Sequence, residues 1–176
     1  ASVLAGLTAA AFDGLQGFSS STIFLTAPHT TRARTRPNVV VKRSRTLTVD
    51  DIHPSRTPRR TRLPRSVVDA AAWCGPDLRS QAIIASAVQQ RLVTPEQLTT
   101  VITRLTTLRK HALIVETVTD VAGGSLSEYE LLFARLCRSY RLPTPTRQTR
   151  RRDASGRWRY LDVEFGQGTI VADWVY

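Results

Sequence analysis

Apolar and polar residues alternate strictly along residues 160–165, and this pattern constrains the fold more than any other feature of the chain. The apolar members are Leu161, Val163 and Phe165, and every residue between them is polar or aromatic with a polar tip. Alternation with a period of two predicts a β-strand with one buried face. A glycine-containing turn at 166–168 and a second short apolar run at 169–172 predict a hairpin.

A helix is predicted just before this hairpin, beginning at Ser127 and ending near Pro143. An acidic helix followed by two strands that each carry an aspartate is typical of a metal-dependent nuclease core. Glu130 on the helix, Asp162 on the first strand and Asp173 at the end of the second are therefore the candidate catalytic residues. Asp162 and Asp173 are the candidate ligands of Mg²⁺, which prefers carboxylate oxygens and can activate a water against phosphate.

This candidate site has weaknesses that the residues themselves reveal. With a two-residue turn, Asp162 lies opposite Val171, where a second metal ligand would help most, and no lysine follows Asp173 to activate the water. Glu130 also has a simpler interpretation as an exposed glutamate favoured by the helix dipole. Mg²⁺ is therefore expected only if the site is active, and no other cofactor is indicated.

Positive charge exceeds negative charge over the whole chain. The 176 residues carry 25 Lys and Arg against 14 Asp and Glu, for a formal net charge of +11, and only Lys42 and Lys110 are lysines. Arginine binds phosphate in a bidentate way and stacks on bases, so this bias favours nucleic acid as a partner. A solvated basic face, a GC-rich coding sequence or an acidic protein partner would explain the same composition.

The basic residues cluster in segments that short predicted strands separate. Such segments can converge on one edge of a small sheet, where they would neutralise several phosphates. The candidate nucleic-acid contacts are Arg32, Arg34, Arg36, Lys42, Arg43, Arg45, Arg56, Arg59, Arg60 and Arg62.

The rest of the pattern predicts an α+β chain in two parts. Residues 1–120 are expected to form a small mixed sheet followed by a helical bundle, and residues 125–176 a partial endonuclease-like α/β unit, with a break near Gly123-Gly124. The predicted helices are Ser2 to about Asp13, a helix from Pro64 towards Gly75, Asp77–Arg91, a helix after the Thr94–Gln97 capping box, and about Leu108–Val118. The predicted strands are Thr22–Ala27, Val39–Val41, about Arg147–Arg152, Trp158–Phe165 and Thr169–Val175.

Simpler sequence features predict the cellular compartment of the protein and a segment upstream of Ala1. No apolar run is long enough to span a membrane, and Cys74 and Cys137 lie far apart in apolar helical contexts, which predicts a cytoplasmic protein with reduced thiols. The chain does not begin with methionine, so we expect a segment upstream of Ala1.

Several motifs together resemble a known family. The Ser127-Glu128-Tyr129-Glu130 helix start, the Arg141-Leu142-Pro143 end, the Leu161-Asp162-Val163 strand and Ile170–Asp173 resemble the C-terminal domain of a large actinobacterial family. That domain is similar to very-short-patch-repair endonucleases within the PD-(D/E)xK restriction-endonuclease-like fold. Upstream stretches also resemble AbiEi-type antitoxins of type IV toxin–antitoxin systems; they are Ser2–Leu15, Val41–Leu47, Asp50–Ile52, Arg65–Ala71 and Arg91–Thr94.

The resemblance implies a DNA-binding regulatory protein of the antitoxin kind. It implies a winged helix upstream and acidic site positions at Glu130, Asp162 and Asp173. Val171 stands where the family has glutamate and Trp174 where it has glycine, so the nuclease-like part is expected to be degenerate or truncated. The alternatives are a magnesium-dependent DNA endonuclease and a protein–protein module that neutralises a cognate toxin.

Overall fold

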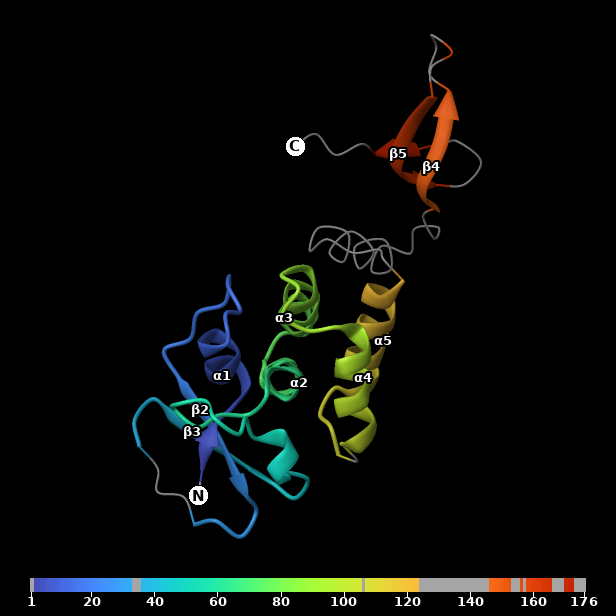
Figure 1. Ribbon diagram of the computed structural model, residues 1–176. Coiled ribbons are helices and arrows are strands. Elements are labelled where there is room, and N and C mark those ends of the chain that lie inside the picture. Colours follow the sequence, from blue (N-terminus) through green and yellow to red (C-terminus); the bar gives the residue numbers. More distant parts are fainter. Residues whose placement is uncertain are drawn as a thin grey trace. The chain divides into compact units, whose positions relative to one another are not determined.

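The computed structural model describes residues 2–32, 36–105, 107–123, 146–152, 156, 158–165 and 170–172. The chain divides into two compact units, Ala1–Glu128 and Tyr129–Tyr176. Among the described residues there are five α-helices and two three-stranded sheets, so the predicted α+β fold is confirmed. Figure 1 shows the order of the elements along the chain.

The sheet of the first unit is mixed. Strand β1 (Val3–Leu4) pairs antiparallel with β2 (Ile23–Pro28), which pairs parallel with β3 (Val39–Ser44). A second segment runs beside β1, because Leu4 N–H donates to the Arg59 carbonyl and Thr61 N–H donates to the Leu4 carbonyl. This pairing fixes the backbone of residues 59–61 against the sheet.

The helices of the first unit surround α2. The five helices are α1 (Gly6–Phe12), α2 (Leu63–Trp73), α3 (Asp77–Gln89), α4 (Pro95–Arg104) and α5 (His111–Ala122), and the 3₁₀ helix η1 (Val49–Asp51) lies between α1 and α2 in the sequence. Figure 1 shows α2 in the middle of this unit, with α1 on one side and α4 and α5 on the other. Every residue of α2 from Arg65 to Ala72 is buried, as expected for a helix that is covered on all sides.

The core of this unit is aliphatic. Its largest fully buried apolar side chains are Val67, Val68, Ile83, Ile84, Leu98 and Ile114. The predicted capping box of α4 is confirmed: Thr94 accepts from Gln97 N–H, and the Gln97 side chain accepts from Thr94 N–H. With Pro95 at its first turn, this helix begins where its sequence signals place it.

Two predicted helix starts lie several residues away from those of the structure. Residues 3–4 form a strand and the helix begins only at Gly6, because the backbone N–H groups of Leu4 and Ala5 donate to the carbonyls of Arg59 and Phe24. Gly6 has φ +54°, and the Trp73 ring lies directly against it. The last helix begins at His111 rather than Leu108, because Lys110 adopts the left-handed conformation with φ 59°.

The second unit contains a three-stranded antiparallel sheet in the order β4-β5-β6. Its strands are β4 (Thr146–Arg152), β5 (Trp158–Phe165) and β6 (Ile170–Ala172). The bounds of β5 agree with those predicted from the alternation. The predicted Ser127–Pro143 helix, the turn at 166–168 and Cys137 lie outside the described residues, whereas Cys74 is a free, half-buried thiol. Within the described ranges, no helix combines the length and apolar character needed to cross a membrane.

Candidate nucleic-acid interface

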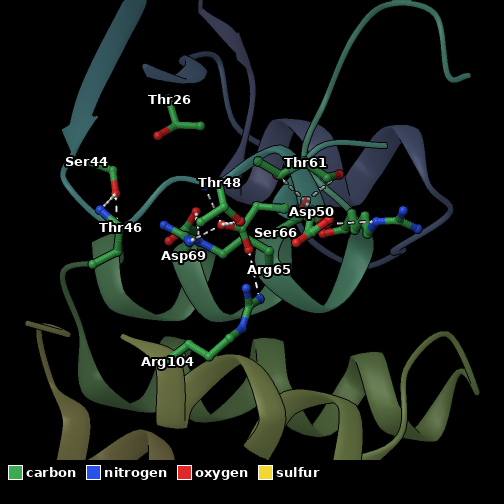
Figure 2. Close-up of polar contacts among 12 residues, drawn as sticks. Thr26, Ser44, Thr46, Thr48, Asp50, Thr61, Arg65, Ser66, Asp69 and Arg104 are labelled. Atoms are coloured by element: carbon green, nitrogen blue, oxygen red, sulfur yellow. Dashed lines mark hydrogen bonds and ion pairs between the residues drawn. The ribbon is translucent and has the colours of Figure 1, made fainter. Parts of the chain in front are cut away.

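Arg65, on the central helix α2, is the centre of a buried polar cluster. Its Nε donates to Asp69 Oδ2 at 3.0 Å, and its Nη1 donates to Asp51 Oδ2 at 3.1 Å. The side chain of Arg65 is 5% exposed, and those of its two partners are equally or more buried. Figure 2 shows Arg65, Asp69 and Arg104 converging on this cluster. A buried guanidinium is tolerated here because two carboxylates balance its charge.

Asp51 connects three elements through one carboxylate. Its Oδ2 also accepts from the Thr48 backbone N–H at 2.9 Å and caps η1, while Oδ1 accepts from Arg104 of α4 at 2.9 Å. Burial alone would raise the pKa of Asp51, but the Thr48 N–H, Arg65 and Arg104 together outweigh it and lower that pKa below its ordinary value. Asp51 is therefore a structural anion.

Asp69 is held in a different electrostatic state. Burial raises its pKa to about 6, an effect that Arg65 opposes and that the nearby charge of Asp51 reinforces. Asp69 lines a hollow that Asp51 does not reach. The two carboxylates on Arg65 thus have different roles: one ties η1 to the helices, and the other faces an open space.

That space is a groove of about 580 Å³ between the end of β3, α2 and the connection from α4 to α5. We call it the basic groove, because four exposed cationic side chains line it in addition to the buried Arg65: Lys42, Arg43, Arg45 and Arg109. All four residues are exposed, and within the described part of the chain none of them forms an ion pair. Trp73 and Leu108 give the groove apolar walls.

Local structure holds the two sides of the groove in place. On the β3 side, the Ser44 hydroxyl accepts from Thr46 N–H at 3.1 Å and fixes the turn that presents Arg45. On the other side, Lys110 donates from Nζ to the Cys74 and Gly75 carbonyls and to Ser80 Oγ, at 2.8 to 2.9 Å. Lys110 thereby secures the α4–α5 connection, and with it Arg109, to the end of α2.

The structure brings together only some of the predicted basic residues. Lys42, Arg43 and Arg45 line the groove. Arg32, Arg36, Arg56 and Arg59 are exposed but do not line it. Arg34 lies outside the described residues.

Arg60 and Arg62 were predicted to contact phosphate, but in the structure both side chains interact with other parts of the protein. Arg60 is buried, donates from Nε to Asp13 Oδ1 at 2.8 Å, and lies over the Phe12 ring. The cause is backbone pairing, because Thr61 N–H joins β1 and draws Arg60 inward. Arg62 is exposed, but its Nε donates to the Asp50 carbonyl at 2.9 Å.

The predicted acidic site is only partly within the described residues. Asp162 lies in the middle of β5, whereas Glu130 and Asp173 lie outside the described residues. The register corrects one expectation: Val171 pairs with Glu164 and not with Asp162, because the β5–β6 connection is longer than two residues. Within the described ranges, no three His, Cys, Asp or Glu side chains are gathered so that they could hold a metal ion.

Two candidate functional residues, Arg109 and Asp69, were not predicted from the sequence. Arg109 has only Lys110 beside it and lies far in the sequence from the longer basic runs, so no basic cluster marked it. Asp69 lies four residues after Arg65 on the buried stripe of one helix, and that spacing predicts an i,i+4 ion pair. An arginine and an aspartate at this spacing within a largely apolar helix could have predicted a buried polar cluster from the sequence.

Comparison of the chain with protein-family models, with curated proteins and with solved structures finds no match.

Proposed function

We propose that this protein binds nucleic acid, DNA in particular, through the basic groove. The observation that carries the proposal is the convergence of Lys42, Arg43, Arg45 and Arg109 on one hollow from two separate parts of the chain. Clefts lined by one sign of charge focus the electrostatic field and raise the local concentration of an oppositely charged ligand. A phosphodiester backbone is the polyanion that such a groove suits.

Some cationic side chains form ion pairs within the protein and others do not, and this difference supports the proposal. Arg60, Arg65, Arg104 and Lys110 form ion pairs with aspartates. The four exposed cations of the groove, Lys42, Arg43, Arg45 and Arg109, have no such partner within the described ranges, so their charge remains available to a ligand. Ser44 and Thr46 also line the groove, and hydroxyls commonly add contacts to the sugar–phosphate backbone.

We further propose a regulatory role of the antitoxin kind rather than phosphodiester hydrolysis. The support is the sequence resemblance, together with valine and tryptophan at two positions where the family's acidic motif has glutamate and glycine. A cognate toxin protein would be the second partner of such a regulator.

The test is titration of the intact protein against labelled duplex and single-stranded DNA at two salt concentrations, with and without Mg²⁺. A denaturing gel of the products separates binding from cleavage. We expect binding that weakens steeply with salt and DNA that stays intact. Binding that salt does not change, or no binding at low salt, would refute the groove as an interface. Mg²⁺-dependent cleavage that Asp162→Asn abolishes would refute the regulatory role.

A further inference from the structure

The basic groove contains a carboxylate that phosphate binding alone does not explain. Asp69 is 3% exposed and lines the groove. Its Oδ2 accepts from Arg65 Nε, but within the described part of the chain no donor reaches Oδ1. The fully buried side-chain polar atoms of that part include only one without a partner, Gln81 Oε1, so Asp69 Oδ1 is not fully buried, and the groove is the hollow that Asp69 lines.

A buried carboxylate with a vacant oxygen repels an anion and attracts a hydrogen-bond donor. The rim of the same groove, with Lys42, Arg43, Arg45 and Arg109, attracts an anion. An occupant that suits both the carboxylate of Asp69 and the cationic residues carries an N–H group at one end and negative charge at the other. Trp73 and Leu108 add apolar wall to the groove, so a fitting occupant also offers an apolar face.

A nucleotide combines these three features. Its phosphate is the anion, the faces of its base are apolar and stack on aromatic side chains, and the edge of the base carries N–H donors. The groove volume of about 580 Å³ lies within the range of pockets that hold small molecules of that kind.

We propose that the basic groove receives one unpaired nucleotide, with its phosphate on the cationic rim and an N–H of its base donating to Asp69 Oδ1. This inference rests on the proposed function and narrows it to strands that expose a base. A base within a duplex has its N–H groups engaged by its pairing partner and its faces covered by the stack. Arg65 holds Asp69 in place and leaves one of its oxygens for the base.

The test compares two single-stranded DNA probes of equal length, one with cytosine at every position and one fully abasic, so that both carry the same phosphates. Fluorescence anisotropy gives the affinity of the intact protein for each. A hydrogen bond to a charged group discriminates by about tenfold or more, so we expect the cytosine strand to bind at least tenfold more tightly. In Asp69→Asn the amide oxygen can accept from Arg65 and turn its NH₂ group to the groove, so the ratio should fall towards one.

Each outcome has a distinct meaning. Equal, salt-sensitive binding of the two strands, tighter binding of the duplex, or an unchanged ratio in Asp69→Asn overturns the unpaired-base inference and leaves the proposed function standing. No binding of any nucleic acid overturns both. If Asp69→Asn does not fold, competition of the wild-type protein with cytidine monophosphate and with deoxyribose 5-phosphate decides. Stronger competition by cytidine monophosphate shows that a free nucleotide suffices, and equal competition by the two compounds overturns the inference.

Discussion

Arg65 Nε lies 3.0 Å from Asp69 Oδ2, one turn further along α2, and both side chains are buried. The same guanidinium reaches Asp51 through Nη1. One arginine therefore joins a structural carboxylate, which caps η1, to a second carboxylate that lines the basic groove. The stability of the fold and the chemistry of the candidate interface depend on the same side chain.

Removing that side chain should cost far more stability than removing its neighbour on the same carboxylate. Arg65→Met leaves two buried aspartates without their shared partner, and breaking a buried pair in this way costs about 3–5 kcal/mol. Arg104→Met also removes a partner of Asp51, but the Arg104 side chain is 45% exposed, so we expect about 1 kcal/mol or less. Urea denaturation measures both free energies of unfolding, and equal losses would contradict the central role of Arg65.

The buried Asp69 should make stability fall as pH rises through the weakly acidic range. Its pKa is about 6 in the folded protein against an ordinary value of 3.8, so the folded state binds the proton more tightly. The stabilisation from this group is complete below about pH 4 and is lost as pH rises through about 6, a change of roughly 3 kcal/mol. Asp51 has the opposite sign, because its lowered pKa gives stability above its ordinary value that is lost as pH falls.

The comparison of wild type with Asp69→Asn isolates this effect. The free energy of unfolding of the wild type, relative to that variant, should decrease between about pH 4 and about pH 7. The carboxyl carbon resonance of Asp69 should titrate with a midpoint near 6. A constant difference in stability, or a midpoint near the ordinary value, would show that Asp69 is not desolvated as described.

Two adjacent arginines should behave in opposite ways. Arg60→Gln removes a buried ion pair with Asp13 and a contact with Phe12, so we expect a loss of stability of about 2–3 kcal/mol. Arg59→Gln changes an exposed residue, and we expect a change below about 0.5 kcal/mol. Thermal denaturation of both variants checks this difference, and a stable Arg60→Gln protein would return Arg60 to the set of candidate phosphate contacts.

Gly6 should resist substitution because of both its conformation and its neighbour. It has φ +54°, and a Cβ atom there would lie 2.8 Å from two Trp73 ring atoms. Gly17 has φ +86° but nothing within 4 Å of its Cβ position. Gly17→Ala should therefore cost only the backbone strain of about 1–2 kcal/mol, and Gly6→Ala clearly more. Equal unfolding free energies for the two variants would show that Trp73 moves freely away.

Local signals in the sequence predicted much of the fold. The alternation along residues 160–165 predicted the strand Trp158–Phe165, which has the bounds of β5, and Thr94, Pro95 and Gln97 placed the start of α4. Both signals depend on residues close together in the chain, which is why sequence alone reveals them. The strand at Val3–Leu4 depends instead on pairing with Leu25 and Thr26 and on the Arg59 carbonyl. These partners are distant in the sequence, and locally the residues show only an apolar stripe that also fits a helix.

The candidate interface was predictable in part for the same reason. The basic run from Lys42 to Arg45 is visible in the sequence and does line the groove. Arg60 lies in an equally basic run, but the pairing of Thr61 with β1 turns it inward. Arg109 and Asp69 reach the groove from other elements, so their role depends on how α2 and the α4–α5 connection pack.

The central claim is that the basic groove binds phosphate, and the salt dependence of DNA binding tests it most directly. Arg43→Gln with Arg45→Gln removes two cations of the groove, and Arg79→Gln with Arg91→Gln removes two exposed cations that do not line it. We predict that the first pair reduces the slope of log affinity against log salt by about 2, while the second leaves it unchanged. Equal slopes for the two double variants would contradict the account and place the interface elsewhere on the chain.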